Sequence, residues 1–101
     1  MKIAITSEGN TLSANIDSRF GRCSFFAIYD TETQQTKFLE NPAKDASGGA
    51  GAAAVQFVAK QGVSKIVAGE FGGKVQPLLE SLNIEMIIEK DKTILEVIKQ
   101  F

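Results

Sequence analysis

The sequence contains no histidine and only one cysteine, Cys23. Without histidine, the chain lacks the usual general base near neutral pH, the Ser-His and Cys-His nucleophile pairs, and the commonest transition-metal ligand. One cysteine cannot form an internal disulfide, and without histidine it cannot complete the four-ligand cage of a structural zinc ion. These absences exclude most familiar enzyme mechanisms. They predict a protein that is not an enzyme and that works in a reducing compartment, the cytoplasm.

The chain also lacks an excess of charge of one sign and any long apolar run. Eleven basic and twelve acidic residues give a net charge of -1 and are scattered along the 101 residues, so nucleic acid and anionic membranes are poor partners. The longest largely apolar runs, residues 50–55 and 84–88, are too short to cross a bilayer, and we expect neither a membrane span nor a signal peptide. A hydrophobic content of 44% predicts one compact domain over residues 1–101.

Apolar periodicity predicts three strands followed by alternating helices and strands. Short apolar and β-branched runs predict strands at residues 2–6, 24–30, 35–40, 65–68 and 84–88. Apolar residues at helical spacing predict helices that begin near residue 50 and near residue 75, the second with Pro77 in its first turn. A third helix is expected to open with the capping box of Thr93 and Glu96 and to place Phe101 on its inner stripe.

This order of elements predicts an α/β fold with three layers, α/β/α, around a five-stranded mixed sheet. Right-handed crossovers would make the first, fourth and fifth strands parallel, with helices on both faces. The second and third strands would form an antiparallel hairpin on one side of the sheet. That arrangement is the ribonuclease H-like plan, although periodicity alone leaves the strand order open.

The densest candidate site is the arginine loop, residues 17–23 (DSRFGRC), which holds both arginines and the only cysteine. The guanidinium groups of Arg19 and Arg22 can bind oxyanions, Gly21 permits a turn or a close approach to a ligand, and Cys23 offers one thiolate to a metal. A thiol facing the pocket would have its pKa lowered by Arg22. The alternative is a tight turn into a strand, with solvated arginines and Cys23 as a small buried residue.

Two glycine-rich segments are predicted to lie beside the arginine loop. Residues 48–51 (GGAG) start a helix, and residues 69–73 (GEFGG) follow a strand. Because the carboxyl ends of parallel strands and the amino ends of the following helices share one edge, we expect all three segments there. Unpaired N–H groups at helix starts can hold an anion. The predicted binding residues are Arg19, Gly21, Arg22, Cys23, Gly48, Gly49, Gly51, Gly69, Gly72 and Gly73, with Cys23 as the only candidate metal ligand.

Each of these assignments has an alternative, and two familiar kinds of site are not predicted. The glycines can instead serve flexible connection and close packing of helices on the sheet. Residues 48–51 lack the lysine and Ser/Thr of a P-loop, and no segment matches G-x-G-x-x-G. A two-metal nuclease needs an acid in the middle of the first strand, which here reads KIAIT.

Together these segments resemble the small single-domain members of the dinitrogenase iron-molybdenum cofactor biosynthesis family, the nitrogenase accessory factor-like domains. The resemblance covers nearly the whole chain. It lies in the opening strand KIAI, the arginine loop leading into Phe26, the helix start GGAG, and the segment IVAG with the glycine loop, helix and IEM strand that follow it. It implies a ribonuclease H-like fold and a carrier, not a catalyst, for an iron-sulfur or molybdenum-containing cluster or its precursor.

The resemblance further implies a reversibly bound metal-sulfur cluster and cofactor-assembly proteins as partners. Some relatives carry histidine near these segments, and this chain has none, so ligation by a Cys and His pair is impossible. A polyanionic cluster would be held by Arg19, Arg22 and backbone N–H groups, with Cys23 as at most one thiolate. Two alternatives stay open: a module that binds a small phosphorylated metabolite, and an interaction domain that uses a sheet edge or a patch near Phe20 and Phe71.

Overall fold

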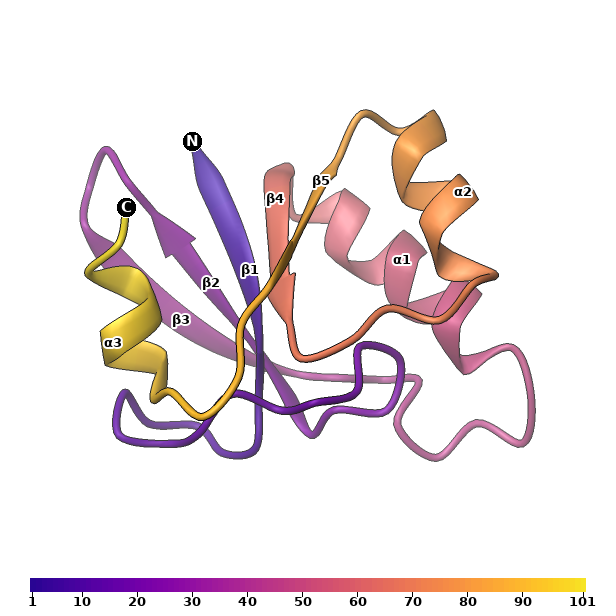
Figure 1. The fold of residues 1–101 in the computed structure, drawn as a ribbon, viewed down its shortest axis with the longest axis horizontal. Coiled ribbons are helices and arrows are strands. Elements are labelled where there is room, and N and C mark those ends of the chain that lie inside the picture. Colours follow the sequence, from indigo (N-terminus) through magenta and orange to yellow (C-terminus); the bar gives the residue numbers. More distant parts are fainter.

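In the computed structural model, which describes residues 1–101, a mixed sheet lies between helices (Figure 1). The elements in chain order are β1 (Lys2–Ser7), β2 (Phe25–Asp30), β3 (Gln35–Glu40), α1 (Ala50–Lys60), β4 (Val63–Ala68), α2 (Val75–Ser81), β5 (Glu85–Ile88) and α3 (Ile94–Ile98). The strand order is β3-β2-β1-β4-β5. β1, β4 and β5 are parallel, whereas β2 is antiparallel to both of its neighbours. The expected three-layer α/β fold with a five-stranded mixed sheet is confirmed.

Helices cover both faces of the sheet, with α1 and α2 on one side and α3 on the other (Figure 1). Side chains alternate along the central strand β1, so that Ala4 joins the core cluster under α1 and α2, while Ile3 and Ile5 join the cluster under α3. Both faces of β1 are therefore buried. This explains why its sequence is almost continuously apolar instead of alternating.

The sequence predicts the start of α3 correctly but not its end. The capping box forms as predicted, because the Thr93 Oγ1 accepts from the Glu96 N–H while the Glu96 carboxylate accepts from the Thr93 N–H. The expectation that Phe101 packs on the inner stripe of this helix is wrong. The helix ends at Ile98, and Phe101 is 37% exposed with its ring 5.9 Å from the Lys65 Nζ.

None of the helices is long and apolar enough to span a membrane.

Candidate functional site

The arginine loop crosses the carboxyl ends of β1 and β4. Asp17 is buried, its N–H donates to the Thr6 carbonyl at 3.0 Å, and its own carbonyl accepts from the Thr6 Oγ1 at 2.7 Å and from the Gly69 N–H at 3.3 Å. One residue of the loop is thus bonded to the ends of two adjacent parallel strands. The loop therefore begins at a rigid position, at the sheet edge where this fold class binds ligands.

Arg19 follows Asp17 in the loop, and most of its guanidinium group makes no bond within the chain. The Asp17 carboxylate accepts from the Arg19 N–H at 2.9 Å and from its Nε at 3.4 Å. The terminal guanidinium nitrogens make no hydrogen bond or ion pair within the chain, and the side chain is 58% exposed. Arg19 is therefore oriented by one carboxylate oxygen and keeps two nitrogens available for a ligand.

Arg22 has a different role from Arg19. Its Nη1 donates to the carbonyls of Lys44 at 3.1 Å and Ala46 at 2.7 Å. These bonds connect the arginine loop to the segment that leads into α1. Arg22 is therefore partly used in shaping the site, and only its remaining N–H groups are free for a ligand.

Asn41 supports the same segment, and sequence analysis did not assign it a role. Its buried Nδ2 donates to the carbonyls of Gly21 and Cys23, both at 3.0 Å, and its Oδ1 accepts from the Ala43 N–H at 3.0 Å. The available signal was the Asn-Pro dipeptide after β3, because asparagine before a turn commonly bonds the backbone two residues on. Its bonds to Gly21 and Cys23, far away in the sequence, carried no local signal.

Three of the predicted glycines lie at close contacts with other parts of the chain. A Cβ on Gly21 would lie 3.1 Å from the Gly51 N and Cα, so the arginine loop packs directly on the start of α1. A Cβ on Gly51 would lie 2.8 Å from the Val75 Cγ2, and one on Gly69 would lie 2.5 Å from the Ser18 Cα. These contacts agree with the packing interpretation of the glycines. They also bring the arginine loop and the start of α1 together.

The other four predicted glycines have open surroundings. A Cβ on Gly48, Gly49, Gly72 or Gly73 would meet no atom within 4 Å. Gly49 has a φ of +70°, which glycine adopts without strain, and it is the N-cap of α1. The helix that follows Gly72 and Gly73 has only seven residues. Ligand binding by these four residues remains a prediction.

Cys23 lies in an environment that disfavours its thiolate. The residue is 0% exposed, its Sγ–H donates to the Phe20 carbonyl at 3.4 Å, and its Sγ accepts from the Asn41 Nδ2 at 3.8 Å. Burial, with a smaller effect of the Asp17 carboxylate, raises the pKa of the thiol to about 12. The direction is opposite to that expected for a thiol facing the pocket beside Arg22. The environment favours the buried structural residue over the metal ligand.

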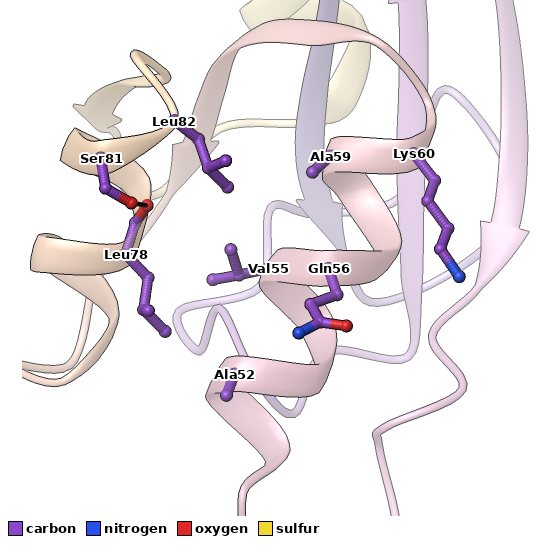
Figure 2. Close-up of a pocket in the computed structure, with 8 residues that line it drawn as sticks. All are labelled: Ala52, Val55, Gln56, Ala59, Lys60, Leu78, Ser81 and Leu82. Atoms are coloured by element: carbon purple, nitrogen blue, oxygen red, sulfur yellow. Dashed lines mark hydrogen bonds between the residues drawn. The ribbon is translucent and has the colours of Figure 1, made fainter.

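A cavity of about 450 Å³ lies away from the arginines, in a groove between α1 and α2 (Figure 2). Val55 of α1 and Leu78 and Leu82 of α2 point into the space between the helices. The chain has no group of three or more His, Cys, Asp or Glu side chains that could hold a metal ion. The candidate site therefore consists of two arginines in a loop that packs on a helix start, without a cage of metal ligands, and anion binding there stays a prediction.

Comparisons with known proteins show the family and the fold of the chain. The family model described as dinitrogenase iron-molybdenum cofactor matches residues 1–101. The apo form of the orange protein from Desulfovibrio gigas is 30% identical, with a TM-score of 0.92 over 99% of this chain and 85% of that chain. A putative NifB protein from Thermotoga is 31% identical, with a TM-score of 0.84 and the same coverage of 99% and 85%. No curated protein matches the chain.

The family match spans every element that surrounds the arginine loop, from β1 through the end of the chain. The two solved structures share the fold over nearly the whole chain at 30% and 31% identity. The resemblance drawn from the residues is thereby confirmed. This protein belongs to the dinitrogenase iron-molybdenum cofactor family.

Proposed function

We propose that this protein is a non-catalytic carrier that reversibly binds an anionic metal-sulfur cluster, or an anionic precursor of one, during metallocofactor assembly. Membership of the family suggests involvement in the assembly of the iron-molybdenum cofactor. The contact between Gly21 and Gly51 carries the proposal. It packs the arginine loop against the start of α1, and in the proposal the two arginines and the N–H groups of that helix start bind one polyanion together.

The start of α1 supplies backbone donors for this surface. No side chain caps the helix, and the first backbone bond into it runs from the Ala53 N–H to the Gly49 carbonyl at 3.0 Å. The N–H groups of residues 50–52 have no partner in the helix and lie at the positive end of its dipole. In the proposal, they bind the anion together with the free guanidinium nitrogens of Arg19.

The strength of such a site follows from its charge-assisted hydrogen bonds. Each contributes about 1.5 to 3 kcal/mol, and several together give binding of about -8 kcal/mol, in the micromolar range. In this proposal the cluster is held through its sulfide or oxide atoms by Arg19, Arg22 and backbone N–H groups. Gly48, Gly49, Gly69, Gly72 and Gly73 line the same edge, and the Cys23 thiol remains buried.

The remaining parts of the proposal concern partners and context. The cluster is cargo, which cofactor-assembly proteins deliver and collect, and residues 1–101 act as one domain. The lack of histidine and of any cluster of acidic or thiol ligands supports a role without catalysis. The lone cysteine supports a reducing compartment, the cytoplasm.

Anaerobic titration with tetrathiomolybdate, followed by amide NMR, tests the proposal. We expect the largest shifts at residues 19–23 and 48–53. Replacement Arg19→Gln should weaken binding about 10- to 100-fold, because it removes a charged hydrogen-bonding group. Lys60→Gln removes an equal charge at the other end of α1 and should leave the affinity within about twofold.

The outcomes separate the proposal from its alternatives. Equal affinity of the Arg19→Gln and Lys60→Gln variants, or shifts spread evenly over the protein, would contradict an anion site at the arginine loop. Displacement of tetrathiomolybdate by equimolar inorganic phosphate would instead support the site for a phosphorylated metabolite. Cys23→Ala should bind like the native chain, whereas a marked loss of affinity with the fold intact would make the thiol a ligand.

A further inference from the structure

Strand β5 forms one edge of the sheet, and half of its backbone groups have no partner. The Glu89 N–H donates to the Ala68 carbonyl at 3.1 Å and so continues the β4 ladder beyond the strand. Because backbone groups alternate in direction along a strand, Glu85 and Ile87 also face β4, whereas Met86 and Ile88 face outward. No bond outside the sheet involves the outward groups. They are free to pair with another strand.

A cavity adjoins these free backbone groups. It measures about 290 Å³ and is lined by Glu70, Phe71, Gln76, Met86 and Ile88. Met86 and Phe71 pack against the core under α1 and α2, whereas Ile87 packs on the opposite face, so the cavity lies on the α1 and α2 side of the edge. The side chain of Ile88 is 62% exposed beside it. Residues 86 and 88 thus present both unpaired backbone and an apolar recess.

We propose that this edge binds an extended segment of a partner protein, which adds as a further strand and carries two basic residues four positions apart. In such strand addition, backbone bonds supply affinity and recesses for alternate side chains supply specificity. Apolar side chains of the segment would lie over the recess beside Met86 and Ile88. The proposal does not depend on the cluster-carrier function.

The acidic side chains along β5 indicate the charge of the partner strand. Glu85 and Glu89 lie four residues apart on the α3 side, and each contacts one lysine of this chain, Lys65 and Lys92. Two copies of the chain could pair their β5 strands in antiparallel fashion, with Met86 of one copy opposite Ile88 of the other. In this register, Glu85 of each copy would lie opposite Glu89 of the other. Like charges directly opposite are destabilising, whereas opposite charges stabilise a strand pair. The edge therefore disfavours a second copy and favours a strand with basic residues at this spacing.

The same edge is adjacent to the candidate anion site. The ring of Phe71, which lines the recess, lies 5.8 Å from the ring of Phe20 in the arginine loop. The backbones of Arg19 and Glu70 also pair as an isolated parallel bridge. A segment bound at β5 would therefore contact the residues that support the arginine loop.

A synthetic peptide tests the proposal on the intact chain. The probe Ser-Thr-Lys-Val-Thr-Val-Lys-Thr-Ser, blocked at both ends, places lysines opposite Glu85 and Glu89 and valines opposite Met86 and Ile88. We expect its binding to slow amide hydrogen exchange at Met86 and Ile88. The exchange rate of the Ile87 amide, which is already bonded to β4, should change much less. The same peptide with glutamate at both lysine positions should bind about 3- to 10-fold more weakly.

Matched variants at one position separate backbone pairing from side-chain contact. Ile88→Ala and Ile88→Pro both remove the exposed side chain, but only Ile88→Pro removes the outward N–H, at an edge where proline is tolerated. Ile88→Pro should bind the peptide about 3- to 10-fold more weakly than Ile88→Ala. Equal affinity of the two variants, or unchanged exchange at Met86 and Ile88 in the native chain, would overturn the proposal. So would a dimer in sedimentation analysis that Ile88→Pro dissociates, because a second copy would then occupy the edge.

Discussion

Gly69→Ala is expected to lower the free energy of unfolding by about 2 to 3 kcal/mol, the upper range for overpacking a tight contact. The added Cβ would lie 2.5 Å from the Ser18 Cα, a contact with backbone that no rotation of a side chain relieves. The Gly69 N–H also donates to the Asp17 carbonyl, so the required shift strains this bond. Urea unfolding followed by far-UV circular dichroism measures the change.

Gly73→Ala is the matched control for this prediction. It adds the same methyl group in the same glycine-rich segment, where a Cβ would meet nothing within 4 Å. The replacement should leave stability unchanged or raise it by up to about 1 kcal/mol, because alanine restricts the unfolded chain. If Gly69→Ala proves as stable as Gly73→Ala, the arginine loop does not pack on β4 as described. If Gly69→Ala is destabilised but still folded, its titration with tetrathiomolybdate shows whether displacement of Ser18 also alters binding at Arg19.

The second large effect is a loss of stability at alkaline pH that depends on Cys23. Burial raises the pKa of the thiol from 9.0 to about 12 in the folded protein. Above pH 9 the unfolded chain therefore releases a proton that the folded chain keeps, so the free energy of unfolding decreases as pH rises. The slope approaches about 1.4 kcal/mol per pH unit, which gives a loss of about 2 kcal/mol between about pH 9 and pH 11.

Comparison with Cys23→Ala isolates this effect from the titration of lysine and tyrosine. The variant is expected to be less stable than the native chain at neutral pH, since it loses the buried sulfur and its hydrogen bonds. Its disadvantage should shrink by about 2 kcal/mol between about pH 9 and pH 11, because only the native chain loses stability through the thiol. Urea unfolding of both proteins across this range measures the difference. A constant difference would mean that the thiol ionises in the folded protein as readily as in the unfolded one.

Local patterns in the sequence determined the elements and much of the fold. The period of apolar residues located the strands and the first two helices, and Thr93 with Glu96 marked the start of α3, because these signals act between residues close in sequence. The end of α3 was predicted wrongly. Phe101 matched the helical period, yet the helix ends earlier and the ring lies against Lys65, a residue distant in the sequence.

For the candidate site too, local sequence patterns predicted which segments take part but not what each residue does. Residue types and spacing singled out the arginine loop and the glycine-rich segments, since arginines and a cysteine within five residues form a local pattern. Their individual roles depend on contacts across the fold. Arg22 bonds carbonyls more than 20 residues away at Lys44 and Ala46, and Asn41 bonds Gly21 and Cys23 from the end of β3.

By itself, the sequence determined the class of fold, the family resemblance and the segments that form the candidate site. Only the tertiary structure decided the strand order, the burial of Cys23, the free guanidinium of Arg19 and the contact between Gly21 and Gly51. The physical reason is that periodicity and capping reflect interactions within a few residues of chain. Burial, pKa and close backbone contact depend on which distant segments the sheet brings together.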